Sequence, residues 1–175
     1  MTSMRARLGS MTAEQRIQTL LHDIGDSPGK RFYSTFMLSQ VQFRSLTQHS
    51  PNTALVTFAF PVDEYYCNNS GAMHGGFQST AFDNLTSLAI MAAVPAGSAW
   101  LDGGVSRVLT VNYLRPASLG EWLVCECEVT HVGKRMAMTR GVLKRERDGA
   151  VVSTCEHNKS VVEGGKPGFG APEKL

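Results

Sequence analysis

Residues 75–94, which read GGFQSTAFDNLTSLAIMAAV, form the longest apolar stretch of the chain and decide its fold. Two glycines open the stretch and Pro95-Ala96-Gly97 closes it, as expected for a single helix. Apolar residues lie on nearly every side of that helix, so it is a core helix rather than a surface one. We therefore predict a buried helix over 75–94 around which the rest of the chain packs.

Strand-like runs flank this helix in the sequence. Residues 32–60 are β-like with a break at Ser50-Pro51-Asn52, and further runs follow at 103–115, 121–132, 135–147 and 150–162. Asp148-Gly149 between the last two is a hairpin signal. This order predicts an α+β fold in which a curved antiparallel sheet wraps around one long buried helix. Open sheet edges would invite pairing with a second copy of the chain.

An additional N-terminal helix precedes this unit. Thr12 and Gln15 form a capping box and apolar residues recur at helical spacing, which predicts a helix from Thr12 to Asp23. We divide the chain into a leader and helix over 1–30 and a single domain over 31–163. The glycine- and proline-rich tail over 164–175 is expected to be disordered.

Composition excludes several classes of function. The chain has 175 residues, 42% of them hydrophobic, which suffices for one soluble domain with its own core. A formal charge of +2 is too small to indicate nucleic-acid binding, and no apolar run is long enough for a membrane span. The four cysteines are not spaced as a metal site, so we interpret them as reduced thiols of a cytoplasmic protein. Mitochondrial and peroxisomal locations are less expected, since only Lys174-Leu175 match a peroxisomal Ser-Lys-Leu ending.

The start of the long helix carries the clearest chemistry. Backbone N–H groups in the first turn of a helix lack helical partners, and the helix dipole favours negative charge there. His74-Gly75-Gly76 opens the helix, and the carboxylate of Asp83 two turns further on is costly in apolar surroundings unless it is used or paired. Donors for a developing oxyanion together with such a carboxylate indicate a hydrolase.

In the order of its elements and motifs, the chain resembles the hotdog-fold acyl-CoA thioesterases, in the branch of the phenylacetate-pathway thioesterases and thioesterase superfamily member 2. The similarity runs from about Phe58 to Val162, and the positions that carry it are Asn68, His74-Gly75-Gly76, Asp83-Asn84, the segment Ser106 to Pro116 with Tyr113, and Gly133-Lys134. It implies a hotdog fold and a thioesterase, which releases a carboxylic acid and a free thiol from acyl-CoA or from an acyl or polyketide carrier protein.

The resemblance also implies a role for each residue. The Gly75 N–H and the Asn68 side chain would bind the thioester carbonyl oxygen, and His74 would shape that pocket or assist the departing thiolate. Asp83, from the facing subunit, would activate water as general base or attack directly, and Ser106 would help hold the water. Family sites lie between the subunits of a homodimer, usually within a homotetramer, with coenzyme A across the interface. No metal and no cofactor beyond this coenzyme A moiety are implied.

Further candidates for substrate binding are Gly76, Phe77, Lys134 and Arg135. Apolar lining from the helix and from the Tyr65-Tyr66 loop suggests a hydrophobic acyl or aryl group. The basic run that begins at Lys134 could meet the phosphates of coenzyme A, although such a run is more often a solvated strand face. Arg107 and Arg115 are alternatives for this contact.

Structural interpretations stay open for these residues. Asp83 could be a satisfied core carboxylate, His74 only a helix cap, and Asn68 an ordinary turn residue. Ser98 could replace Ser106, because the connection after Asp83 is longer than the resemblance leads us to expect. We interpret two strand histidines as structural, since no ligand cluster lies near them in the sequence: His131 and His157.

Two functional alternatives stay open as well. A dehydratase or hydratase acting on acyl thioesters could use the same fold, and so could a protein that binds acyl thioesters without catalysis. Turnover of an enoyl thioester without thiol release would indicate the first alternative. Coenzyme A binding that is unchanged in Asp83→Ala, with no thiol release, would indicate the second.

Overall fold

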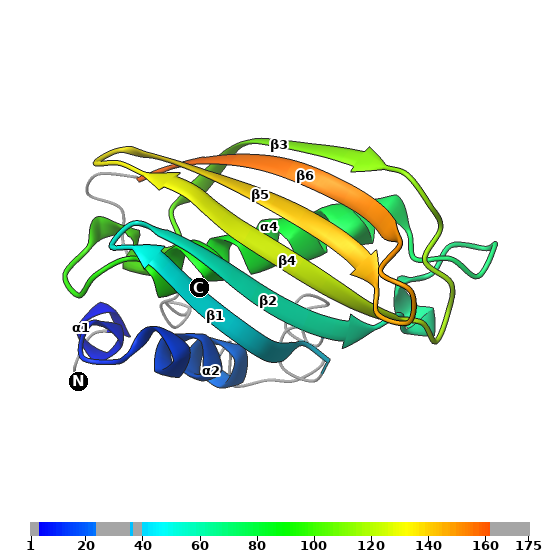
Figure 1. Cartoon of the computed structure of the whole chain (residues 1–175), viewed down its shortest axis with the longest axis horizontal. Helices are drawn as coiled ribbons and strands as arrows, with labels where there is room; N and C mark the ends of the chain where they lie inside the picture. Colours follow the sequence, from blue (N-terminus) through cyan, green and yellow to red (C-terminus); the bar gives the residue numbers. More distant parts are fainter. Residues whose placement is uncertain (1–3, 24–35, 37–39, 162–175) are drawn as a thin grey trace, which may run out of the picture.

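The structure is a computed structural model that describes residues 4–23, 36 and 40–161. In this part of the chain one antiparallel sheet has the strand order β1-β2-β4-β5-β6-β3. Its strands are β1 (Gln42–Ser50), β2 (Thr53–Pro61), β3 (Val105–Tyr113), β4 (Trp122–Val132), β5 (Met136–Arg145) and β6 (Val151–Ser160). The sheet curves over the long helix α4 (Gly75–Ala93), which confirms the predicted α+β architecture (Figure 1).

The core lies between α4 and the inner face of the sheet. Period-two alternation places every second residue of β4 against α4, and the buried ones include Leu123, Cys125, Cys127 and Val129. Cys125 and Cys127 share this face, and their Sγ atoms lie 3.7 Å apart as free thiols. Burial raises the pKa of the Cys127 thiol well above its ordinary value, so these thiols act as small apolar residues.

A glycine in the middle of β5 allows α4 to approach the sheet closely. A Cβ atom at Gly141 would come within 2.7 Å of the Phe82 ring and 2.8 Å of the Cys155 Sγ. Phe82 is buried on α4, and its ring occupies the space that a side chain at residue 141 would need. The lateral position of α4 on the sheet therefore depends on this one close contact.

Helix α2 (Ala13–Asp23) packs against α4, and the short helix α1 (Met4–Gly9) lies beside residues 99–102, which follow α4. The predicted capping box is present, since the Thr12 N–H donates to Gln15 Oε1 at 2.9 Å and the Gln15 N–H donates to Thr12 Oγ1 at 3.2 Å. Arg16 projects from α2 into the core and is 5% exposed. Its guanidinium donates to the carbonyl oxygens of Leu8, Met91 and Val94, which include the last carbonyls of α4.

The structure corrects the predicted β-like run from residue 32. Strand β1 begins only at Gln42, and Phe36 is helical and buried. The Phe36 ring meets the rings of Phe60 and Phe77 edge-on, each at 4.9 Å between centroids, so its apolar character serves this cluster rather than a strand. Residues 24–35 and 37–39 lie outside the described residues, and so does the tail that was predicted to be disordered.

Two 3-10 turns were not predicted: η1 (Glu64–Tyr66) and η2 (Ala99–Asp102). Each begins at a polar side chain that caps it, Asp63 for η1 and Ser98 for η2. Both lie in connections that the sequence marked as loops, and η2 leads from α4 into β3. Among the described helices, none is long and apolar enough to cross a membrane.

We predict that Arg16→Met strongly destabilises the fold. The substitution leaves buried carbonyl oxygens at the end of α4 without their donor, which costs about 3 kcal/mol of unfolding free energy. Urea unfolding at fixed protein concentration measures this loss. Arg140→Met is the matched control, because Arg140 pairs with Glu156 on an exposed strand face and should cost less than about 1 kcal/mol. Equal losses in the two variants would contradict the prediction.

Candidate functional site

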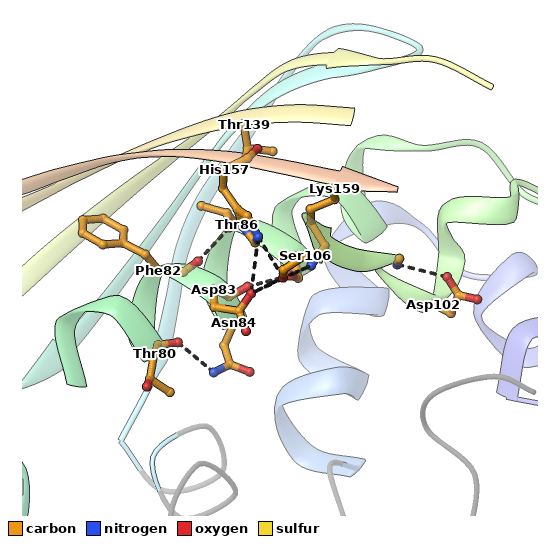
Figure 2. A network of polar contacts seen from close by, with 12 residues as sticks. Thr80, Phe82, Asp83, Asn84, Thr86, Asp102, Ser106, Thr139, His157 and Lys159 are labelled. Atoms are coloured by element: carbon orange, nitrogen blue, oxygen red, sulfur yellow. Dashed lines mark hydrogen bonds and ion pairs between the residues drawn. The ribbon is translucent and has the colours of Figure 1, made fainter. Parts of the chain in front are cut away.

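Asp83 and Ser106 form the centre of the site. Asp83 lies on α4 with 46% of its side chain exposed, and Ser106 lies near the start of β3. The Ser106 hydroxyl donates to Asp83 Oδ1 at 2.6 Å, as Figure 2 shows. The alternative serine, Ser98, instead accepts the Trp100 N–H and caps η2. The pair that the resemblance implied is therefore adjacent within one chain.

Strand pairing and a bulge bring side chains of β6 beside the Asp83–Ser106 pair. Ser106 is directly opposite Lys159 in the β3–β6 ladder, and the register shifts between Ser106 and Val108. Such a bulge re-aims the side chain beside it. His157 Nε2 lies 2.9 Å and Lys159 Nζ 3.0 Å from Ser106 Oγ. The same two nitrogens lie 3.4 and 3.9 Å from Asp83 Oδ1.

His157 is fully buried and neutral. Burial, together with the Lys159 ammonium, lowers its pKa to about 4, against the opposing effect of Asp83. Ser106 donates its single hydrogen to Asp83, so its lone pairs face the nitrogens of His157 and Lys159. Because His157 Nε2 faces a lone pair, the neutral ring carries its hydrogen on Nε2. Nδ1 lies 2.7 Å from the Thr86 hydroxyl of α4, which itself donates to the Phe82 carbonyl at 2.7 Å. The hydrogens on Ser106 Oγ and His157 Nε2 thus point along the path from His157 to Asp83.

This outcome corrects the interpretation of His157 as merely structural. Together with Lys159, which the sequence analysis did not consider, it lies on the inner face of β6 and contacts the Asp83–Ser106 pair. Two ionisable residues at alternate positions on the predicted inner face of a strand were the available signal. Its partners could not be found, because Asp83 is more than 70 residues away in sequence and the pairing depends on the register of β3 and β6.

The N-terminus of α4 forms a second cluster. His74 Nδ1 accepts the Gly76 N–H at 3.0 Å, so His74 is the helix cap and Gly76 is already satisfied. Among the described residues none accepts the Gly75 N–H. Tyr113 of β3 covers this turn, since its hydroxyl donates to the Gly75 carbonyl at 3.0 Å and a Cβ at Gly75 would come within 3.3 Å of its ring. Glycine at 75 therefore allows close approach and leaves one donor open.

Asn68 lies in the turn before this helix. Its Oδ1 accepts the N–H groups of Ser70 at 2.9 Å and Ala72 at 3.3 Å, as a turn residue does. That contact fixes the carboxamide while its Nδ2 donates to no residue in the described ranges. Asn68 is thus a turn residue whose amide hydrogens are available for a ligand.

The two clusters do not meet within one chain. Gly75 and Asp83 lie eight residues apart on one helix, and a helix rises about 1.5 Å per residue, so the two clusters are about 12 Å apart. A single thioester carbonyl cannot contact both. The structure therefore brings Asp83 and Ser106 together, but it does not bring Asn68, His74 and Gly75 to them.

The other substrate-binding candidates lie elsewhere. Phe77 is 7% exposed and stacks on Tyr66 at 3.7 Å between ring centroids, so within this chain it belongs to the core. Lys134 and Arg135 are exposed on the β4–β5 hairpin. The later members of the basic run pair with carboxylates, and these pairs are Arg140–Glu156, Lys144–Glu126, Arg145–Asp148 and Arg147–Glu121. That part of the run is a neutralised strand face.

A pocket of about 190 Å³ opens beside the Asp83–Ser106 pair. Leu88 and Met91 of α4 give it an apolar side, while Asp102 of η2 and Lys159 give it a polar one. Asp102 is itself held, since its Oδ1 accepts the Gly104 N–H at 3.1 Å. Histidine, cysteine and acidic residues do not gather as a metal-binding group anywhere in the described ranges.

Comparisons with known proteins find thioesterases among the similar sequences and structures. The model of the thioesterase superfamily matches residues 70–152. Acyl-coenzyme A thioesterase 13 of Homo sapiens is 31% identical over 98 residues, which cover 56% of this chain and 66% of that protein, just under two thirds of its length. The family match covers residues 70–152, and it agrees with the class of enzyme that the sequence predicted.

Solved structures share the fold. The crystal structure of zebra fish thioesterase superfamily member 2 superposes with a TM-score of 0.70 at 24% identity, covering 87% of this chain and all of that one. A hypothetical thioesterase protein with coenzyme A from Streptococcus pneumoniae has a TM-score of 0.59 at 19% identity, covering 71% of this chain and 90% of that one. The fold is therefore the hotdog fold that the resemblance implied.

We predict that the buried His157 makes stability depend on pH. Its pKa is about 4 in the fold and 6.5 ordinarily, so the unfolded chain binds the proton first as the pH falls. Unfolding free energy is therefore retained above pH 6.5 and lost on the way down to about pH 4, by on the order of 2–3 kcal/mol. Urea unfolding across this range should show the loss in wild type. The loss of unfolding free energy should be much smaller in His157→Gln. It should be unchanged in His131→Gln, which alters an exposed histidine of β4. An identical pH slope in His157→Gln would contradict the assignment.

Proposed function

We propose that this protein hydrolyses acyl-coenzyme A thioesters to a carboxylic acid and free coenzyme A. The observation that carries the proposal is the half-exposed Asp83 carboxylate, fixed by the Ser106 hydroxyl beside a pocket. The match of residues 70–152 to the thioesterase superfamily supports it, as does the acyl-coenzyme A thioesterase activity named for the human relative. The coenzyme A named in the streptococcal structure supports the same substrate class.

In the proposed reaction Asp83 acts on a water molecule. The water oxygen bonds to the thioester carbon while Asp83 takes the proton, and the carbonyl oxygen becomes an oxyanion. When the oxyanion collapses, the carbon–sulfur bond breaks and the thiolate leaves with the bond's electron pair; the proton returns to solvent or to the thiolate. Because a thiolate leaves readily, one base and two oxyanion donors suffice, and the proposal includes no metal or redox cofactor.

The proposed oxyanion donors are the Gly75 N–H and the Asn68 amide of a second copy of the chain. The 12 Å spacing estimated along α4 means that one chain supplies either the base or the donors to a given thioester, but not both. Of the two edges of the described sheet, the β3 edge fits this arrangement, because β3 and the residue after it expose Val105, Val108, Tyr113 and Leu114. A homodimer built on this edge would carry two equivalent sites. A homotetramer is compatible with the same contact.

The acyl group and its carrier are further parts of the proposal. Leu88 and Met91 favour a hydrophobic acyl group in the pocket beside Asp83. Lys134 and Arg135 are exposed and basic, and they are proposed to contact the phosphates of coenzyme A. A carrier-protein thioester presents the same phosphopantetheine thioester, so it is tested alongside coenzyme A.

We predict that Asp83→Asn lowers thiol release by about 10³-fold, because the amide cannot take the proton from water. A disulfide reagent measures release from short, long and aromatic acyl-coenzyme A substrates and from an acyl carrier protein. Asp148→Asn is the matched control: it removes the same charge from a distant hairpin and should keep wild-type rates. Release that survives in Asp83→Asn would contradict the mechanism. Hydration of an enoyl thioester without thiol release would favour a hydratase. Binding of the acyl thioester without any turnover would favour a non-catalytic binding protein.

We predict that two inactive variants restore each other when they are mixed. Asn68→Asp keeps the oxygen that holds the turn but loses the amide donor, and Asp83→Asn loses the base. After joint unfolding and refolding, random assortment gives half mixed dimers, each with one site free of both substitutions, so about a quarter of wild-type activity should return. Mixing either variant with itself is the control. If mixed dimers of verified composition recover no activity, the base and the oxyanion donors do not come from different chains, which would contradict the proposal.

A further inference from the structure

Lys159 is a buried cation that the proposed reaction does not use directly. It is 3% exposed on the inner face of β6 and lines the pocket beside Asp83. Lysine is almost never buried to this degree without a partner, because removing an ammonium from water is costly. Its presence at this position therefore needs an explanation in terms of what its Nζ contacts.

An ordinary stabilising ion pair does not provide that explanation. Asp83 Oδ1 lies 3.9 Å from Lys159 Nζ, and almost half of the Asp83 side chain is exposed, so the attraction is weakened by water. The shorter contact, 3.0 Å, is to the uncharged hydroxyl of Ser106. A buried ammonium directed at a neutral hydroxyl points to a role in orienting that hydroxyl.

The donor and acceptor capacities of the three groups decide the orientation. A histidine nitrogen can donate to Ser106 Oγ or accept from it, depending on the tautomer, so His157 alone would allow the hydroxyl hydrogen to turn toward the ring. An ammonium can only donate. Lys159 therefore occupies one lone pair of Ser106 Oγ. The hydroxyl hydrogen goes to Asp83 at 2.6 Å, because an ionised carboxylate, which the nearby ammonium favours, can only accept.

We propose that Lys159 is a positioning residue of this site: its ammonium fixes the Ser106 hydroxyl as a donor to Asp83 and favours the ionised carboxylate. The inference rests on the proposed thioester hydrolysis for its kinetic consequences only. The charged or titratable groups around Asp83 are Lys159 and His157 from β6 and Asp102 from η2, which lines the same pocket. Lys159 is the one cation among these described groups, so its removal leaves the carboxylates uncompensated. Burial lowers the pKa of Lys159 and Asp83 opposes this, consistent with an ammonium held in place by the carboxylate.

The kinetic test compares Lys159→Met, which keeps the stem and removes the charge, with Lys159→Arg, which keeps the charge. In Lys159→Met we expect kcat to fall about 10- to 100-fold with KM little changed. The acid limb of kcat/KM should move upward in pH, because a positive charge is removed from the site. Lys159→Arg should keep the limb near its wild-type position. Lys144→Met is the control, since Lys144 pairs with Glu126 on the outer strand face and its loss should leave the limb unmoved.

A second readout does not depend on turnover. The Lys159 ammonium helps to hold the pKa of His157 at about 4, so the imidazole of His157, followed by NMR, should titrate at higher pH in Lys159→Met and near its wild-type pH in Lys159→Arg. An unmoved acid limb and an unmoved imidazole titration in Lys159→Met would overturn the proposal. If Lys159→Met does not fold, an acid limb displaced in Lys159→Arg, despite the retained charge, would overturn it equally. Absence of thiol release by wild type would refute the proposed function, while the imidazole titration would still decide the electrostatic role of Lys159.

Discussion

Burial of α4 is the constraint on which the rest of the structure depends. The helix is apolar on nearly every side, so the sheet has to curve around it and α2 has to pack against its C-terminal end. The contact between Phe82 and the backbone of Gly141 sets how closely helix and sheet approach. Because Asp83 is the next residue along the helix, that same contact determines where the carboxylate emerges at the edge of the covered surface.

This position explains the chemistry that surrounds Asp83. Residues on the inner face of β6 are buried as α4 packs. Ser153 is one polar group among them, and the two ionisable ones, His157 and Lys159, must find partners. Ser106, opposite Lys159 in the ladder, supplies a hydroxyl that contacts both His157 and Lys159 and donates its hydrogen bond to Asp83. Asp83 itself stays partly in water, so one end of the network is buried and rigid while the other end is open to a substrate.

Local sequence predicted those parts of the protein whose cause is local. The apolar stretch over 75–94, the capping box at Thr12 and the four later strand runs all follow from periodicity and capping within a few residues, and each is present. The pairing of Asp83 with Ser106 came from a family resemblance, and the geometry agrees with it. In contrast, the helical conformation of Phe36 was missed because its ring packs against aromatic residues from distant segments.

The unpredicted site residues share one physical reason. His157, Lys159 and Tyr113 are joined to α4 by strand register, and a shift of one residue would turn each of them to the other face of the sheet. Arg16 likewise meets the end of α4 only through the docking of α2. Sequence patterns give the faces of single elements, but they do not give the register between elements, so polar residues that find their partners across the sheet cannot be assigned in advance.

A single helix also explains why a second copy would complete the site. Oxyanion donors gain strength from the N-terminus of a helix, whereas a general base needs the partly desolvated position that the middle of α4 offers to Asp83. Both requirements are met on one helix, but they are met at points about 12 Å apart. Two antiparallel copies of α4 that meet across the β3 edges would place the start of each helix against the middle of the other. Two-fold symmetry would then create two equivalent sites at once, because the contact that brings one base to one set of donors is repeated by the same rotation.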